Sequence, residues 1–131
     1  MKLLLDTHYV YALAGAPVRL SRTESDFLSL HRASLCASVL SLWEIRLKWN
    51  ARHSSGAQKG PAAPDLVRAM LAELGVPLID FQPEHACGPL DPPIAHGDPF
   101  DEMLLVQAGA ENARLLTRDR ALAGHRLVMT A

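Results

Sequence analysis

An α/β fold with a short, mainly parallel sheet is predicted by three observations. Short apolar runs such as "KLLL" (residues 2–5) and "SLCASV" (34–39) are typical of buried strands. Segments with helix start and stop signals lie between these runs. The two kinds of segment alternate along the chain, which favours a parallel sheet whose strands are connected by helices.

The same signals predict the elements in order. The expected strands cover residues 2–5, 34–39, 76–81, 113–117 and 125–130. The expected helices cover residues 7–14, 21–31, 41–49, 65–74 and 98–111. Ser21 begins the second helix with Glu24 as its capping-box partner, and Pro77 indicates an early or edge position for the third strand. Residues 50–64 are expected to form a polar loop, and residues 83–97 to start as a helix that Gly and Pro cut short.

Length and composition are those of one globular domain, which we expect to span residues 1–131. Apolar residues make up 49% of the chain, and no apolar run approaches the ~18 residues that cross a membrane. The first apolar run breaks at Asp6, too early for a secretory signal, so we expect a cytoplasmic protein without membrane contact. Cys36 and Cys87 lack the spacing of a metal site and are expected to be buried free thiols.

Five acidic residues stand where an apolar strand ends, where a helix begins, or within an apolar helix. They are Asp6, Glu44, Asp98, Asp101 and Asp119. Each of them alone has a structural explanation, and helix capping is the most frequent one. Asp98 before Pro99 suits an N-cap, and Glu44 fits a capping box with Ser41.

Together the five acids indicate a metal site. In a parallel sheet the carboxyl ends of the strands form one crevice, where Asp6, Asp119 and the start of the helix 98–111 would meet. Carboxylates this close raise one another's pKa unless a cation neutralises them. Oxygen ligands without a cysteine cluster suit Mg²⁺ or Mn²⁺, and such sites commonly carry out phosphoryl chemistry. Without these five, nine acidic residues remain against thirteen basic ones. The basic residues that could hold phosphates lie on and after the helix 41–49 and around Asp119, and they are Arg46, Lys48, Arg52, Lys59, Arg114, Arg118 and Arg120.

Four stretches resemble, in order and spacing, the acidic motifs of PIN-domain ribonucleases: "LLLDTH", "SLWEI", "DPFDEMLLVQA" and "LLTRD". The resemblance is greatest to the toxins of VapBC-type toxin–antitoxin pairs. It implies a three-layer α/β/α sandwich and an endoribonuclease that depends on Mg²⁺ or Mn²⁺. It also implies, by position, a set of metal-site acids and two hydroxyl residues that orient them. The acids are Asp6, Glu44, Asp101 and Asp119, with Asp98 as an outer-sphere ligand or a cap, and the hydroxyl residues are Thr7 and Thr117.

The resemblance further implies a reaction and partners. RNA would be hydrolysed to products with 5′-phosphate and 3′-hydroxyl ends, and since no histidine is needed as nucleophile, His8 and His96 are left out of the site. A cognate antitoxin would lie across the helix 41–49, where Trp49 is a candidate contact, and the toxin would form a homodimer. Glu102 stands where related proteins carry Arg, a change that could alter substrate contacts or the number of metal ions.

Two other functions fit the same residues. A PIN-like scaffold could bind RNA or protein without cutting, although such a module gains nothing from a costly acidic pocket. A PIN nuclease of RNA maturation would need no antitoxin. Metal-dependent cleavage that disappears in Asp6→Asn would exclude the first alternative, and an antitoxin-like reading frame just upstream of the gene would favour the toxin over the second.

Overall fold

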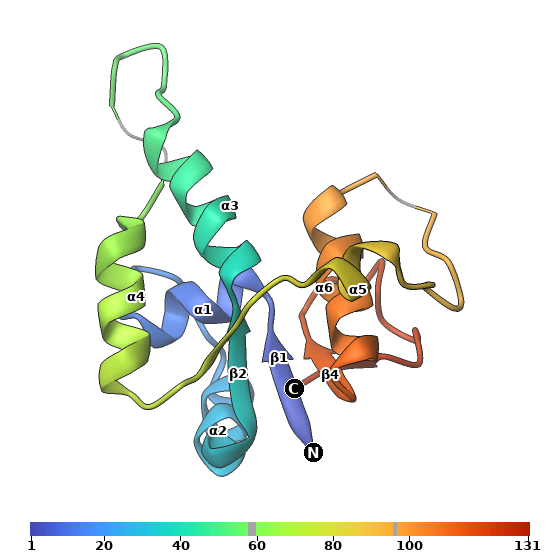
Figure 1. Ribbon diagram of the computed structural model, residues 1–131. Coiled ribbons are helices and arrows are strands. Elements are labelled where there is room, and N and C mark those ends of the chain that lie inside the picture. Colours follow the sequence, from blue (N-terminus) through green and yellow to red (C-terminus); the bar gives the residue numbers. More distant parts are fainter. Residues whose placement is uncertain (58–59, 96) are drawn as a thin grey trace.

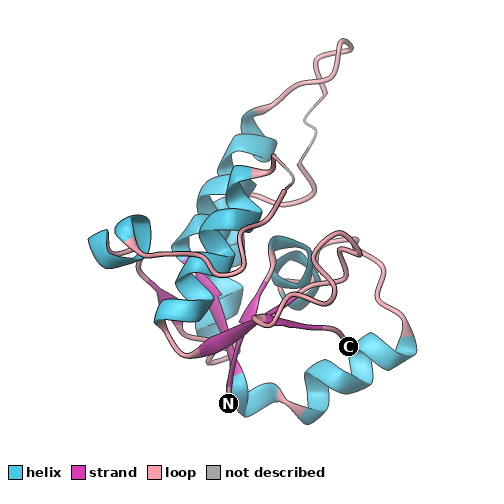
Figure 2. Ribbon diagram, turned by 90° about the vertical axis from the view of Figure 1, so that its right-hand side faces the viewer, coloured by secondary structure: helices cyan, strands magenta, loops and turns pink. Residues whose placement is uncertain are grey.

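The computed structural model describes residues 1–57, 60–95 and 97–131, and over these residues it has the predicted α/β fold. Its strands form one parallel sheet in the order β3-β2-β1-β4-β5. They are β1 (Lys2–Leu5), β2 (Leu35–Ser38), β3 (Leu78–Ile79), β4 (Ala113–Leu116) and β5 (Val128–Met129). The sheet grows from β1 in one direction through β2 and β3 and in the other through β4 and β5, so the strand order reverses beside β1. Figure 2 shows the strands in the middle of the molecule, between the helices.

Helices cover both faces of the sheet and give the expected three layers. They are α1 (Thr7–Leu13), α2 (Arg22–Leu30), α3 (Val39–Asn50), α4 (Pro64–Glu73), α5 (Pro83–Cys87) and α6 (Pro99–Ala110), with a 3₁₀ turn η1 (Arg32–Ser34) after α2. Figure 1 shows α1, α3 and α4 on one side of β1 and β2, and α5 and α6 on the other. No helix in the described ranges is both long enough and apolar enough to cross a bilayer.

Side-chain caps fix where most of these helices begin. The capping box of Ser21 and Glu24 starts α2 as predicted, and Asp98 caps α6 by accepting a hydrogen bond from the Phe100 N–H at 2.9 Å. The expected box of Ser41 with Glu44 is wrong, because the hydroxyl of Ser38 caps α3 one turn earlier. Glu44 therefore lies inside the second turn of α3, where its carboxylate is not needed for capping.

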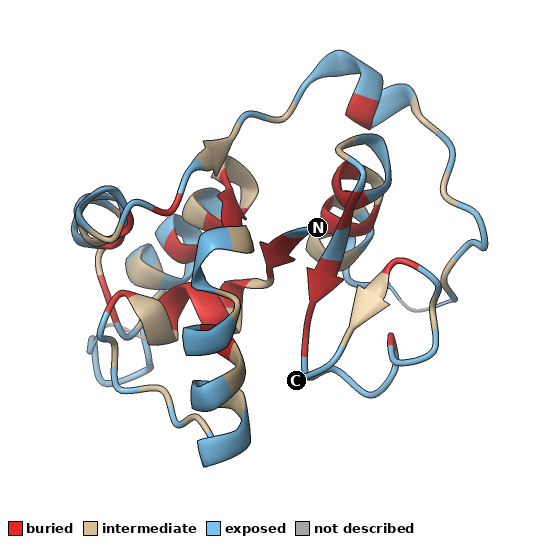
Figure 3. Cartoon of the chain, turned by 90° about the horizontal axis from the view of Figure 1, so that it is seen from below, coloured by how far each residue is buried: buried red, intermediate tan, exposed pale blue. Residues whose placement is uncertain are grey.

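The two faces of the central strand pack against different helices. Leu3 and Leu5 belong to one hydrophobic cluster with residues of α1, α3 and α4, and Leu4 belongs to a second cluster with residues of α6. All three leucines are at most 2% exposed, which explains why this strand is a continuous apolar run. Figure 3 shows the buried residues (red) concentrated on the strands and on the helix faces that cover them.

The structure corrects several sequence expectations. Residues 76–81 and 125–130 contribute only the two-residue strands β3 and β5, both at sheet edges. β3 starts after Pro77, which has no N–H to donate and pairs only through its carbonyl, to the Ala37 N–H at 2.9 Å. Both cysteines are free, as expected, but Cys87 is exposed and only Cys36 is buried.

Candidate functional site

Asp6 follows β1 and is held at the carboxyl edge of the sheet. Its backbone N–H donates to the Leu116 carbonyl of β4 at 3.1 Å, and its side chain caps α1 by accepting from the Tyr9 N–H at 3.2 Å. The other carboxylate oxygen accepts a hydrogen bond of 2.6 Å from the hydroxyl of Thr117. Burial raises the pKa of the Asp6 carboxyl above its ordinary value, although the hydrogen bonds from Thr117 and Tyr9 act in the opposite direction.

Glu44 reaches the same edge of the sheet from α3. One carboxylate oxygen accepts a hydrogen bond from the Thr7 hydroxyl at 2.6 Å. The other lies 2.9 Å from the Nζ atom of Lys48, one turn further along the helix. The Thr7 hydroxyl is also 3.1 Å from the hydroxyl of Ser41, so a buried pair of hydroxyls orients the Glu44 carboxylate.

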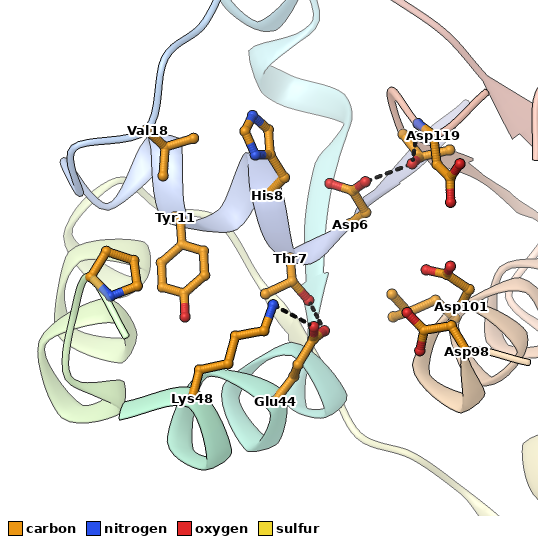
Figure 4. A pocket seen from close by; sticks show the side chains of 13 residues that line it. Asp6, Thr7, His8, Tyr11, Val18, Glu44, Lys48, Asp98, Asp101 and Asp119 are labelled. Atoms are coloured by element: carbon orange, nitrogen blue, oxygen red, sulfur yellow. Dashed lines mark hydrogen bonds and ion pairs between the residues drawn. The ribbon is translucent and has the colours of Figure 1, made fainter. Parts of the chain in front are cut away.

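Asp98 and Asp101 stand at the first turn of α6, on the opposite layer. Asp98 is the exposed N-cap residue, and Asp101 is half-buried three positions later on the same side of the helix. Pro99 at the first helical position fixes the backbone between them, because its ring is compatible with the helix start and it has no N–H to satisfy. The helix start thus presents two carboxylates toward Asp6 (Figure 4).

Asp119 follows β4 and is joined to Asp6 through Thr117. The buried hydroxyl of Thr117, which donates to Asp6, also accepts the Asp119 N–H at 3.1 Å. The Asp119 carboxylate accepts the Ala121 N–H at 2.9 Å, which holds the side chain against the turn that follows. Thr117 therefore fixes the positions of Asp6 and Asp119 relative to each other.

All seven residues that the sequence predicts for the site line one cavity of about 390 Å³. They are Asp6, Thr7, Glu44, Asp98, Asp101, Thr117 and Asp119, which follow β1 and β4, begin α1 and α6, or lie in the second turn of α3. The cavity lies at the carboxyl edge of the sheet next to β1, where the strand order reverses, which is the usual ligand position in open parallel sheets. Figure 4 shows the acids converging on it from both helical layers.

The donor atoms of this cavity fit a hard divalent cation. Carboxylate and hydroxyl oxygens are the ligands that Mg²⁺ and Mn²⁺ prefer, and neither cysteine lines the cavity. A cation would also relieve the unfavourable burial of charge that raises the pKa of Asp6. Within the described residues no three His, Cys, Asp or Glu side chains are close enough to form a ready-made ion site. The carboxylates of Asp6 and Glu44 are instead held by their own partners, Thr117 for the first and Thr7 and Lys48 for the second.

The model of one protein family, the PIN domain, matches residues 3–125, which is nearly the whole chain. The chain belongs to the PIN-domain family. Among solved structures, this PIN domain is similar to DNA-bound VapBC from Salmonella typhimurium, with a TM-score of 0.63, 16% identity and coverage of 100% of this chain and 97% of that one. It is also similar to VapBC2 from Rickettsia felis bound to a DNA fragment from their promoter, with a TM-score of 0.65, 19% identity and coverage of 100% and 98%. No curated protein sequence gives a significant match.

Arg118 of this PIN domain, a candidate phosphate contact in the sequence, forms an ion pair with a carboxylate. Its guanidinium donates to both oxygens of Glu24, at 2.7 and 3.1 Å, and to the Arg19 carbonyl at 2.9 Å. Glu24 also accepts the hydroxyl of buried Tyr9 at 2.6 Å. The segment that carries Thr117 and Asp119 is thus fastened to α1 and α2 through Arg118.

Six more of the described residues line the cavity of the PIN domain, and the sequence does not predict them as ligands. They are His8, Tyr11, Val18, Lys48, Pro61 and Leu104. Two could have been found from helical spacing, because Tyr11 lies four positions after Thr7 and Lys48 four positions after Glu44. The sequence gives no reason to include His8 in the site, yet His8 lines the cavity. His96 and Lys59 lie outside the described residues.

Glu102 and Trp49 lie elsewhere than the sequence suggested. Glu102 lines a separate cavity of about 300 Å³ between α5 and α6 rather than the acidic one. Trp49 is only half-exposed, and Gly60 packs against its backbone so closely that a Cβ at Gly60 would lie 2.7 Å from the Trp49 nitrogen. The exposed apolar side chains of α3 are instead Trp43 and Leu47, at 55% and 48% exposure.

Proposed function

We propose that this PIN domain is a divalent-metal-dependent endoribonuclease, the toxin of a VapBC-type toxin–antitoxin pair that acts in the cytoplasm. The observation that carries the proposal is the gathering of five acids from separate elements in one cavity at the strand-order reversal. Helix capping explains Asp98, but it does not explain Glu44, whose carboxylate lies past the helix start and points into the cavity. The similarity of the fold to two VapBC structures supports the toxin assignment.

Asp6, Glu44, Asp101 and Asp119 would hold Mg²⁺ or Mn²⁺, with Asp98 at the rim as an outer ligand or solely as a cap. The bound cation would supply an acidified water and charge neutralisation at the phosphate. Because the cavity is rich in negative charge, an RNA phosphate would be repelled from it without that cation. Thr117 would hold Asp6 and Asp119 in place, and Thr7 would hold the Glu44 carboxylate in its orientation. The carboxylates would then rearrange little when the cation binds.

Cleavage of RNA by the purified protein with Mg²⁺, Mn²⁺ or EDTA tests this function. Asp6→Asn and Asp101→Asn should each lower the rate at least about 100-fold, equivalent to about 2.7 kcal/mol of transition-state stabilisation. Asp26→Asn is the matched control, because Asp26 is an exposed acid of α2 outside the cavity, with a side chain 74% exposed. Cleavage that persists in EDTA, or in both cavity variants, would contradict the proposal.

We further propose that the protein binds a cognate antitoxin and forms a homodimer. Exposed Trp43 and Leu47 on α3, the helix that carries Glu44, offer an apolar surface that a partner segment would cover beside the cavity. Expression with and without the neighbouring gene should give growth arrest only without it, and the arrest should disappear in Asp101→Asn. The mass of the isolated protein from light scattering tests the dimer. Arrest that is unaffected by the neighbouring gene would favour a PIN nuclease without an antitoxin.

A further inference from the structure

The cavity has two ends of different chemistry. One end carries Asp98, Asp101 and Asp119, as described above. The other, here called the Tyr11–Lys48 end, is formed by Tyr11, Val18 and Lys48, from α1, the segment after it and α3 (Figure 4). Pro61 also lines the cavity, and its neighbour Gly60 packs against the backbone of Lys48 and Trp49, which places Pro61 at this end. A cavity of about 390 Å³ is much larger than a hydrated ion needs at about 30 Å³ per water, and it falls in the range of small-molecule sites. The Tyr11–Lys48 end therefore has room for part of a substrate.

Two buried polar atoms of the cavity lining have no hydrogen-bond partner among the described residues. In the ranges that the structure describes, the hydroxyl of Tyr11 and the Nε2 atom of His8 are buried without a hydrogen bond. Tyr11 is 5% exposed as a whole, so its hydroxyl is not simply solvated. Buried polar atoms are nearly always hydrogen-bonded in proteins, because an unsatisfied group loses its water without compensation. Both atoms belong to residues that line the cavity, but only the Tyr11 hydroxyl points toward Lys48, whereas the His8 ring projects away from it (Figure 4). The Tyr11 hydroxyl therefore indicates a ligand with a polar atom as its partner at the Lys48 side of the cavity.

Lys48 supplies a cation at this end. It is the one Lys or Arg among the described residues that line the cavity. Its Nζ atom pairs with Glu44 at 2.9 Å, and its side chain is 52% exposed, so it can change partner without unpacking the core. When Glu44 binds a divalent cation its charge is shared with that cation, and the attraction between Glu44 and Lys48 falls. The Lys48 ammonium is then available to an anion in the cavity.

We propose that the Tyr11–Lys48 end binds the RNA nucleotide next to the cleaved phosphodiester. Lys48 contacts the phosphate of that nucleotide, the Tyr11 hydroxyl hydrogen-bonds one of its oxygens, and Val18 and Pro61 pack against its sugar. A nucleotide matches this end because it combines an anion, hydrogen-bonding oxygens and an apolar sugar face. The proposal rests on the proposed nuclease function and adds to it a substrate subsite whose residues are not the metal-binding acids.

Binding of a short fluorescein-labelled RNA that spans the mapped cleavage site, followed by fluorescence anisotropy in Ca²⁺, tests the subsite. Lys48→Met should weaken binding about 10-fold and lower the slope of log K against log salt by about 0.7, the value for one phosphate contact of a single strand. Tyr11→Phe should weaken binding about 3-fold and leave the slope unchanged, because it removes a neutral hydrogen bond. The melting temperature of this variant should not fall, since the hydroxyl has no hydrogen-bond partner in the part of the chain that the structure describes.

Arg22→Met is the matched control, because it also removes one charge from an i,i+4 ion pair, with Asp26 on α2, but outside the cavity. It should change affinity less than about 2-fold and leave the slope unchanged. Equal effects of Lys48→Met and Arg22→Met, or a lower melting temperature for Tyr11→Phe, would overturn the subsite.

Calorimetry with Mn²⁺ in the absence of RNA separates a substrate role of Lys48 from a role in orienting Glu44. Affinity for Mn²⁺ should be unchanged or tighter in Lys48→Met, because a competing charge has been removed from Glu44. Weaker Mn²⁺ binding would mean that Lys48 positions the carboxylate, and would overturn the proposal. A wild-type protein that neither binds nor cuts RNA would refute the nuclease function itself. If the wild type cuts RNA but Lys48→Met and Tyr11→Phe bind RNA as tightly as the wild type does, only the subsite is refuted.

Discussion

Replacing Glu24 by Gln should destabilise the fold in a pH-dependent way. Glu24 accepts hydrogen bonds from Tyr9, Ser21 and Arg118, and its side chain is 13% exposed. Burial raises the pKa of this carboxyl, but the hydrogen bonds and the Arg118 charge outweigh it and lower the pKa from 4.5 to about 2. Gln keeps the shape of the side chain and loses the charge, so the variant isolates the electrostatic part of the contact.

The size of the effect follows from the shift in pKa. At about 1.4 kcal/mol per pKa unit, the lowering from 4.5 to about 2 corresponds to at most about 3.5 kcal/mol. The Arg118 side chain is 43% exposed, so solvent screening reduces the expected loss at neutral pH to about 1–2 kcal/mol. Because the folded-state pKa is lower than the unfolded one, this stabilisation is complete above pH 4.5 and is lost as the pH falls toward 2.

Urea denaturation of the wild type and Glu24→Gln between pH 7 and pH 2 measures this difference. The two free energies of unfolding should differ by about 1–2 kcal/mol at pH 7 and converge as Glu24 of the wild type becomes protonated. Asp26→Asn on the same helix is the control, since its exposed pair with Arg22 at 3.9 Å should contribute less than about 0.5 kcal/mol. A difference that stays constant down to pH 2 would refute the assignment of the stabilisation to the Glu24 charge.

Three further outcomes are expected. Thr117→Val should reduce RNA cleavage about 10-fold with little change in melting temperature, because it removes the hydroxyl that links two acids; unchanged kinetics would argue against that link. In a thiol-labelling assay at pH 8, exposed Cys87 should react at once and Cys36 only after unfolding, because burial raises the pKa of the Cys36 thiol to about 11; two fast thiols would contradict this. Gly60→Ala should cost about 1–3 kcal/mol in urea denaturation, because its Cβ would lie under 3 Å from backbone atoms of Trp49; an unaltered midpoint would show that the contact relaxes.

The gathering of the acids could be predicted because it depends on a general property of parallel sheets. Asp6 and Asp119 each follow a strand, so parallel pairing of the two strands brings both residues to the same edge of the sheet. The cap signals at Asp98 locate the start of α6. The partner of Arg118 could not be predicted, since Glu24 lies 94 positions away and the pairing depends on how α2 docks. The exposure of Trp43 rather than Trp49 likewise depends on which side of α3 faces α4, and a helix that is apolar all round does not specify that side.

The pairing of β1 with β4 has a consequence for synthesis of the chain. Asp6 and Thr117 are 111 positions apart, and β4 lies directly beside the first strand of the sheet. A polypeptide still emerging from the ribosome therefore lacks one wall of the pocket, together with the hydroxyl that orients Asp6, until residue 119 has been translated and released. The nuclease that we propose would therefore have no complete acidic site while its own message is being translated.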